Sequence, residues 1–256
     1  MKTILITIAC LLLSCHFLLA QQARFTSSGS IDFEKTSNMN ALFKKLYGNM
    51  QGSIQQALEQ YQKTQPQFKV VKSTLVFSND KTLYTPIAES LISNTLNTPM
   101  SDQLNTVYTD LAANTTTLQK NISDAFFLVK DSVRKIKWKI TDETRVIAGY
   151  PCRRANGLVL DSIYVVAFYT DKITVSGGPE SFSGLPGMIL EVALPHENVT
   201  WVAKKVTDVQ IAPATITPPK KGKVVNNKQM YDFIKNLLGT RADAAQLSFL
   251  MKSYLL

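Results

Sequence analysis

The chain has 256 residues, of which 45% are hydrophobic, and its formal net charge is +9. This length suits one large domain or two small ones with an ordinary globular core. Basic residues are scattered in pairs, without a stripe that alternates basic and aromatic side chains, so the composition does not indicate nucleic-acid binding.

The first twenty residues are typical of a secretory signal peptide. Lys2 supplies a positive charge, residues 4–13 form an apolar run, and the small residue Ala20 precedes polar sequence. We therefore expect cleavage after Ala20 and export to the periplasm, the cell envelope or the medium. The alternative is a lipoprotein signal with Cys15 as the lipid attachment point. No second long apolar run follows, so we expect no transmembrane span after signal removal.

A helical segment interrupts the early strands. Residues 29–34 alternate apolar and polar positions, which predicts a short strand. Apolar residues then recur three and four positions apart over 38–63, which predicts a helix. Gly48 and Gly52 weaken its middle and favour a break into two helices. Pro66 ends the helical segment.

Strand patterns dominate the middle of the chain. Alternating or β-branched stretches follow one another with turn signals about ten residues apart, as in an antiparallel meander. The exception is 86–101, which predicts a loop with one helical turn. Strands are expected over 67–77, 82–86, 105–119, 124–132, 134–141, within 144–157, 162–175, 188–194 and 198–212.

These elements predict an α+β fold: a single curved antiparallel β-sheet, a half-barrel-like meander, with helices packed on one face and further helices at the C-terminus. Asn226 or Asn227 is expected to cap a helix over 228–238, and a last helix covers 242–255. The expected organisation is a signal peptide at 1–20, a sheet domain at 21–217 with the inserted helix 38–63, a basic Pro/Lys linker at 218–225, and C-terminal helices at 226–256.

A Gly- and Pro-rich stretch precedes one of the strands. Pro fixes φ near −65° and Gly accepts positive φ, so Leu185-Pro186-Gly187-Met188 has the pattern of a type II turn. The first interpretation is a turn that leads into a strand, and the second is a binding loop in which Phe182 and backbone amides form a pocket wall. The candidate residues of this loop are Gly178, Pro179, Phe182, Gly184, Leu185, Pro186 and Gly187.

The same stretch carries a family resemblance. SGLPGMILEV (183–192) resembles the signature of the GLPGLI family of secreted proteins, with Met188 in place of the usual Leu. The segments 136–155 and 165–184 resemble neighbouring parts of that family, with Phe168 in place of a usual Trp. The resemblance covers roughly 120–210. It implies a signal-bearing envelope protein of Bacteroidota-type bacteria, with no established activity and no catalytic residues to carry over.

The residue types needed for catalysis are scarce. Beyond the signal peptide the chain keeps one Cys, Cys152, and one His, His196, which cannot complete a zinc site. Cys152 is the candidate reactive thiol because Arg153 and Arg154 follow it, and positive charge favours thiolate. The alternative is a buried strand residue, since alternation sends Arg153 to the opposite face. We expect no catalytic residues, cofactor or metal, and therefore no enzyme.

The expected function is a non-catalytic binding or interaction protein of the cell envelope. An apolar small ligand would lie between sheet and helices, unless ordinary core side chains fill that space. The alternative is an accessory or scaffold subunit of an outer-membrane system, with an outer-membrane protein as partner. A Cys-dependent hydrolase that uses Cys152 is the third hypothesis.

Overall fold

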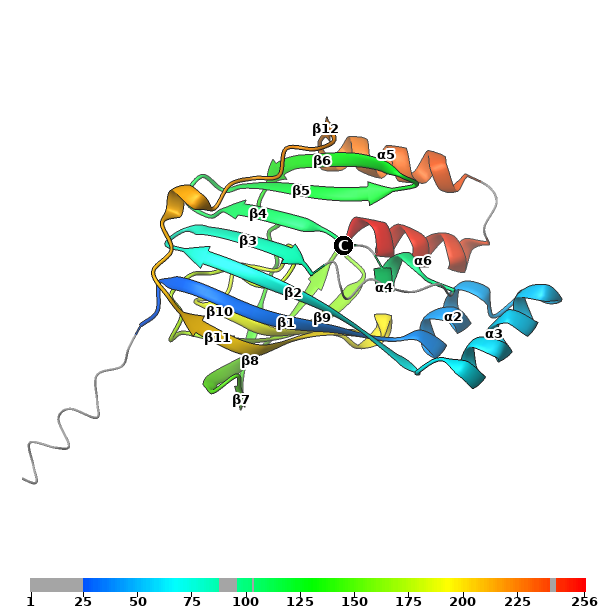
Figure 1. Ribbon diagram of the computed structural model, residues 1–256, viewed down its shortest axis with the longest axis horizontal. Coiled ribbons are helices and arrows are strands. Elements are labelled where there is room, and N and C mark those ends of the chain that lie inside the picture. Colours follow the sequence, from blue (N-terminus) through cyan, green and yellow to red (C-terminus); the bar gives the residue numbers. More distant parts are fainter. Residues whose placement is uncertain (1–24, 88–95, 103, 240–242) are drawn as a thin grey trace, which may run out of the picture.

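The computed structural model describes residues 25–87, 96–102, 104–239 and 243–256. Within these residues twelve strands form one sheet in the order β12-β6-β5-β4-β3-β2-β1-β11-β10-β9-β8-β7. Neighbouring strands are antiparallel, except that β12 runs parallel to β6. The sheet curves strongly, and the helices gather at one end of it (Figure 1). The predicted α+β class with a curved antiparallel sheet is confirmed.

The strands follow the expected meander in most places. Their bounds are β1 Ser28–Asn38, β2 Phe68–Ser78, β3 Lys81–Pro86, β4 Thr106–Asp110, β5 Thr115–Ile122, β6 Ala125–Ser132, β7 Lys139–Ile147, β8 Tyr150–Val159, β9 Ile163–Thr170, β10 Met188–Leu194, β11 Val199–Asp208 and β12 Lys223–Val225. The helices are α2 Met39–Tyr47, α3 Ser53–Thr64, α4 Pro99–Asp102, α5 Asn227–Leu238 and α6 Ala244–Leu255, with short 3₁₀ turns at η2 Pro195–Glu197 and η3 Pro213–Thr215.

Strand β1 lies in the middle of the sheet, between β2 and β11. Its side chains alternate, so Ile31 and Phe33 are buried while Asp32 is exposed. The same alternation on the neighbouring strands gives the concave face an apolar lining. The core therefore lies inside the curve, between the sheet and the segments that cross it.

The helical segment after β1 breaks where the glycines predict. The Asn38 side chain accepts a hydrogen bond from the backbone N–H of Ala41 and begins α2. Helix α2 ends before Gly48, and Gly52, with φ of 77°, precedes α3. Thus the predicted break of the helical segment into two helices is confirmed.

The expected strand over 105–119 is instead a hairpin. Strands β4 and β5 pair with each other, and the turn between them ends at Asn114, which has φ of 52°. The side chain of Asp110 accepts a hydrogen bond from Ala113 N–H and closes this turn. Asn114 lies among residues that favour strands, so the sequence pattern did not indicate a turn there.

The expected strand over 134–141 begins only at Lys139. Strand β6 lies next to one edge of the sheet and β7 forms the other edge, so residues 133–138 must connect distant strands. Trp138 anchors this connection, because its Nε1–H donates to the backbone oxygen of Ser183 at 2.9 Å. A period-two pattern therefore marks a segment that crosses the fold outside the sheet.

The segment 218–225, expected to be a linker, contributes to the sheet. Its last three residues form β12, which adds to β6. Asn226 then begins α5 with a reciprocal pair of hydrogen bonds to Gln229, so the cap expected at Asn226 or Asn227 is Asn226. Asp243 and Gln246 form the same arrangement at α6.

Helix α6 is held by the other helices and by one buried carboxylate. It contacts α2, α4 and α5. Glu197 of η2 is buried and accepts hydrogen bonds from Lys45 of α2 at 2.9 Å and from Lys252 of α6 at 3.4 Å. These contacts join two helices to the β10–β11 turn.

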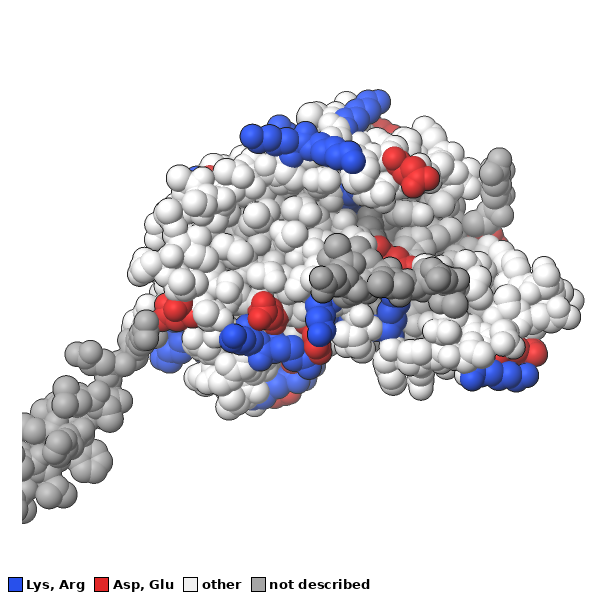
Figure 2. Space-filling model, viewed as in Figure 1, with Lys and Arg blue, Asp and Glu red and all other residues white. Residues whose placement is uncertain are grey.

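Charged side chains are unevenly spread on the visible surface. On the face drawn in Figure 2, the surface over β3, β4 and β5 carries few charges, and basic side chains gather near β12 and below β1. Across the described ranges, every helix is too short or too polar to cross a bilayer.

The turn before β10 differs from the expected type II turn. The N–H of Gly187 donates to the oxygen of Leu185 at 2.7 Å, which closes a three-residue turn around Pro186. Met188 N–H bonds instead to Ile173 O. Gly187 has φ of 138°, and a Cβ there would lie 2.1 Å from the oxygen of Thr170. Only glycine fits this position.

We predict that Gly187→Ala lowers the free energy of unfolding by about 3 kcal/mol or more, because strain at positive φ adds to a backbone clash. Gly149→Ala is the matched control: its φ is 85°, but a Cβ there meets no atom within 4 Å. We expect this control to cost about 1–2 kcal/mol. Urea denaturation of both variants measures the difference, and equal losses would contradict the close packing at Gly187.

Candidate functional site

The Gly- and Pro-rich stretch before β10, residues 176–187, lies inside the curve of the sheet, and we call it the Gly-Pro loop. Phe182 is 2% exposed, and its ring centroid lies 5.8 Å from that of Trp201 on β11. Gly178 is also tightly packed, since a Cβ there would lie 2.6 Å from the backbone oxygen of Phe182. Ser176 fastens the loop by donating to Leu185 O at 2.6 Å. The main role of the loop is thus to form part of the hydrophobic core and to lead the chain into β10.

Little space remains between this loop and the sheet. Phe182 and Trp201 line a cavity of about 10 Å³, and Ser181 lines a second one of about 30 Å³. Both are smaller than the 300–1,000 Å³ of a typical small-molecule site. Side chains of the loop therefore fill most of the space next to the inner face of the sheet at this point.

An acidic residue of the loop is buried among basic ones. Glu180 has φ of 52°, and its Oε2 accepts a hydrogen bond from Asn105 at 3.0 Å. Burial raises the pKa of Glu180, while Lys35, Lys120 and Arg134 around it oppose that rise. Burial likewise lowers the pKa of Lys35, whose Nζ lies 5.1 Å from the ring centroid of Trp201.

Two of these cations hold the end of α6. Lys120 Nζ donates to the backbone oxygen of Tyr254 at 2.7 Å, and Arg134 Nη2 donates to that of Leu255 at 2.8 Å. Positive charge at the last turn of a helix is favourable because the carbonyl groups there carry partial negative charge. Burial lowers the pKa of Lys120 to about 7. We call Lys35, Lys120, Arg134 and Glu180 the interior charge cluster.

The interior charge cluster was not among the predicted sites, although the sequence contains a pattern that indicates part of it. Lys35 continues the buried face of β1 that Ile31 and Phe33 begin. Lys120 lies between Leu118 and Ile122 on the buried face of β5. A lysine in phase with the apolar positions of a strand indicates a buried cation.

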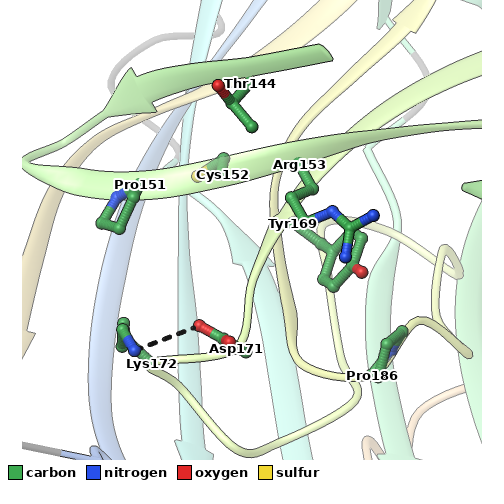
Figure 3. A pocket seen from close by; sticks show the side chains of 8 residues that line it. All are labelled: Thr144, Pro151, Cys152, Arg153, Tyr169, Asp171, Lys172 and Pro186. Atoms are coloured by element: carbon green, nitrogen blue, oxygen red, sulfur yellow. Dashed lines mark ion pairs between the residues drawn. The ribbon is translucent and has the colours of Figure 1, made fainter. Parts of the chain in front are cut away.

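A hollow with a volume of about 460 Å³ opens where β8 begins and β9 ends (Figure 3). Arg153 and Tyr169 are partners in the β8–β9 register and lie side by side. Pro186 of the Gly-Pro loop lies across from them. The complete lining is Thr144, Pro151, Cys152, Arg153, Tyr169, Asp171, Lys172 and Pro186.

The hollow combines a buried floor with exposed polar groups at its rim. Tyr169 is 4% exposed, so it forms floor, whereas Arg153 and Asp171 are exposed. Asp171 pairs with Lys172 at 3.6 Å, and Arg153 with Asp142 at 3.8 Å. Exposed ion pairs of this kind are weak, so these side chains are available to hydrogen-bond a polar ligand.

Cys152 reaches this hollow but faces the other side of β8. Its side chain is 1% exposed, and its thiol donates to Tyr150 O at 3.4 Å. Burial raises the pKa of Cys152 to about 12, and the charge of Arg145 opposes this rise only in part. The thiol therefore stays protonated at neutral pH. Arg153 points to the opposite face, as alternation predicts, and does not activate it.

The other residues weighed for catalysis stay apart. His196 lies in η2, between β10 and β11, as expected for a turn residue. Its ring centroid lies 6.2 Å from that of Tyr164. Within the described ranges, no three His, Cys, Asp or Glu side chains converge in a way that could hold a metal ion.

These features define the chain as an α+β domain in which a large curved sheet encloses a packed loop and carries a polar hollow at its side. Residues 60–232 match the family described as the N-glycanase peptide, N-terminal domain. This match covers more than half of the chain, which therefore belongs to that family.

Two solved structures of PNGF-II are similar to the chain. The structure in space group P21 is 15% identical with a TM-score of 0.51, and the match covers 81% of this chain and 33% of that one. The structure in space group C2 is 14% identical with a TM-score of 0.48, covering 88% and 33%. This chain thus spans about a third of the PNGF-II chain. It matches no curated protein.

The family match corrects the resemblance to GLPGLI proteins. The segments that carried it, from roughly 120 to 210, lie inside the 60–232 match to the N-glycanase domain. The physical reason is that Leu-Pro-Gly before an apolar strand is turn chemistry, which unrelated folds share. The expected function is corrected by the same match: an uncharacterised, non-catalytic binding protein, with a scaffold subunit or a Cys152 hydrolase as alternatives, is replaced by membership of an N-glycanase domain family.

We predict that native Cys152 reacts with iodoacetamide at pH 8 about a hundredfold more slowly than the same residue in the unfolded chain, because little thiolate forms. Mass spectrometry of the peptide that contains Cys152, with and without 8 M urea, measures both rates. Cys152→Ser identifies any signal from other residues. Equal rates in the two states would contradict the buried, protonated thiol.

We also predict that stability rises with pH near neutrality. Between pH 7.5 and 8.5 the unfolded chain keeps a proton on Lys120, whose ordinary pKa is 10.5, while the folded chain, with a pKa of about 7, has released it. Raising the pH therefore favours the folded state, by about 1 kcal/mol per pH unit.

Lys120→Met should remove most of this increase, whereas Lys130→Met, which alters an exposed residue of the adjacent strand β6, should keep it. Urea denaturation at pH 7.5 and 8.5 measures the slope in each chain. Partial ionisation of Cys152 in the unfolded chain opposes the rise, but it does so equally in all three chains and cancels in their comparison. An unchanged slope in Lys120→Met would show that Lys120 remains charged.

Proposed function

We propose that the chain takes part in the processing of N-linked glycans and that it binds the glycan in the hollow between β8, β9 and the Gly-Pro loop. One observation carries this proposal: every residue that lines the hollow falls within the 60–232 match to the N-glycanase domain. The family name points to N-linked glycans, and the hollow has room for sugar rings.

The lining suits a sugar in both size and chemistry. A volume of about 460 Å³ is within the range of small-ligand sites. Sugar hydroxyls both donate and accept hydrogen bonds, and Arg153 and Lys172 supply donors while Asp171 supplies acceptors. The rings of Pro151 and Pro186 are exposed and offer apolar surfaces for the C–H faces of a sugar.

Arg153 is the main specificity residue in this proposal. Its guanidinium presents several N–H groups in a fixed plane, which matches pairs of neighbouring hydroxyls or a carboxylate on an acidic sugar. It lies beside Tyr169, whose buried ring limits where the side chain can move. The ion pair between Arg153 and the exposed Asp142 breaks at little cost in free energy.

We propose that this chain contributes recognition and leaves cleavage of the glycan–protein bond to groups outside the hollow. Its lining has one carboxylate, Asp171, paired with Lys172, and a protonated thiol, Cys152. General acid–base work on a bond needs a group held at hydrogen-bond distance with a matched pKa, and these two groups do not form such a pair. We further propose export through residues 1–20, where glycoproteins outside the cell would be the targets.

We predict that Arg153→Ala lowers the affinity for an N-glycopeptide about tenfold, since a hydrogen bond to a charged group contributes about 1.4 kcal/mol. Arg154→Ala is the matched control. Its side chain lies on the other face of β8, where it pairs with Glu143, and the change should leave the affinity within about twofold. Isothermal titration calorimetry measures both.

The deglycosylated peptide is the ligand control for the same titrations. Binding of the glycopeptide alone supports the proposal. Equal affinity for both peptides, or no binding of either, would overturn it. A loss that is equal for Arg153→Ala and Arg154→Ala would move the glycan away from the hollow.

A further inference from the structure

A second, much smaller cavity lies between β4, β5, β6 and the Gly-Pro loop, and its rim includes the exposed residues Ser132 and Asn227. Its volume is about 30 Å³, which is room for a single small species. The inner faces of β4, β5 and β6 form its wall, while Arg134 and Ser181 face it from the crossing segments. Its lining is Thr109, Thr116, Leu118, Val129, Ser132, Val133, Arg134, Ser181 and Asn227.

Two polar atoms at this cavity are buried and lack hydrogen-bond partners within the described structure: Arg134 Nη1 and Ser181 Oγ. Arg134 Nη2 is already used by Leu255 O, at 2.8 Å. A guanidinium nitrogen can only donate, so Nη1 requires an acceptor in the cavity. A buried charged donor without one is costly, typically more so than a neutral group.

No carboxylate of the described residues pairs with Arg134 at that position. Among the described residues Arg134 forms no ion pair, and the nearby carboxylate of Asp131 is engaged with the backbone N–H groups of Asn227 and Ser132. The hydroxyl of Thr116 likewise donates elsewhere, to Tyr108 O at 3.1 Å. The side chains that line the cavity therefore do not neutralise the positive charge of Arg134.

The buried carboxylate of Glu180 does not belong to Arg134 alone. Lys35 and Lys120 also act electrostatically on Glu180, so three basic side chains share it. Burial lowers the pKa of Arg134, and only Glu180 opposes this. Charges inside a protein are stable when they are paired. A water molecule would satisfy the Nη1 donor, but it would not neutralise the guanidinium.

We propose that this cavity is a binding site for a single halide ion, physiologically chloride, held by Arg134 Nη1 and Ser181 Oγ. A volume of about 30 Å³ suits a monatomic anion better than a polyatomic one such as sulfate. The ion joins the connection between β6 and β7, which carries Arg134, to the Gly-Pro loop, which carries Ser181. It thereby fixes the loop whose other end, Pro186, lines the hollow.

Bromide replaces chloride in such sites and can be located by its anomalous scattering. Crystals of the unaltered chain are grown with sodium bromide in place of sodium chloride. We expect an anomalous peak in the cavity within hydrogen-bond distance of Arg134 Nη1. The absence of a peak there would overturn the proposal, because the cavity would then hold water.

Thermal unfolding gives a second readout in solution. Sodium chloride and sodium gluconate are compared at equal ionic strength, and gluconate is too large for the cavity. We expect chloride to raise Tm by about 2–4 °C in the unaltered chain. The shift should persist in Lys135→Met, which alters the exposed neighbour of Arg134, and disappear in Arg134→Met.

Ser181→Ala is a milder variant, in case Arg134→Met does not fold, and we expect it to reduce the chloride shift. Equal Tm values in chloride and gluconate for the unaltered chain would overturn the proposal even if a bromide peak were present, since the ion would then be adventitious. This test does not involve glycan binding, so its outcome is independent of the function proposed for the hollow.

Discussion

The fold depends on how the inner face of a strongly curved sheet is filled. A sheet that bends this far has an apolar concave surface that its own side chains cannot cover, and the loop over residues 176–187 covers it. Phe182 packs on Trp201, and Gly187 allows the backbone to pass against Thr170 on its way into β10. Because the loop is also one wall of the hollow, the packing of the core and the shape of the candidate site are set by the same residues.

Most of the architecture could be predicted from local patterns. Period-two stretches gave the strands, the glycines at 48 and 52 located the break between α2 and α3, and Asn226 marked the start of α5. The failures share a physical cause, which is that local pattern does not report partners distant in sequence. Residues 133–138 look like a strand, yet they connect opposite sides of the sheet. The Leu-Pro-Gly turn is likewise a local solution, and it led to the wrong family.

The candidate site was less accessible to prediction than the fold. Cys152 and Pro186 were singled out separately, and the structure brings them to one hollow, but Tyr169, Asp171 and Lys172 carried no pattern that marked them. Their proximity arises from the β8–β9 register and the path of the chain after β9. The interior charge cluster is different, because lysines in phase with apolar strand positions were visible in the sequence. What could not be foreseen was that the ends of α6 and the loop would meet these lysines.

The sheet remains open, and this has a consequence for how the chain behaves among its own copies. In the described residues β7 pairs on one side only, with β8, so a row of backbone groups lies exposed at the edge. Such an edge can recruit a strand from another molecule. Strand β7 carries Lys139, Asp142, Glu143 and Arg145, most of them exposed, and an incoming strand would have to bury these charges. The charges on β7 thus disfavour edge-to-edge aggregation at this end of the sheet.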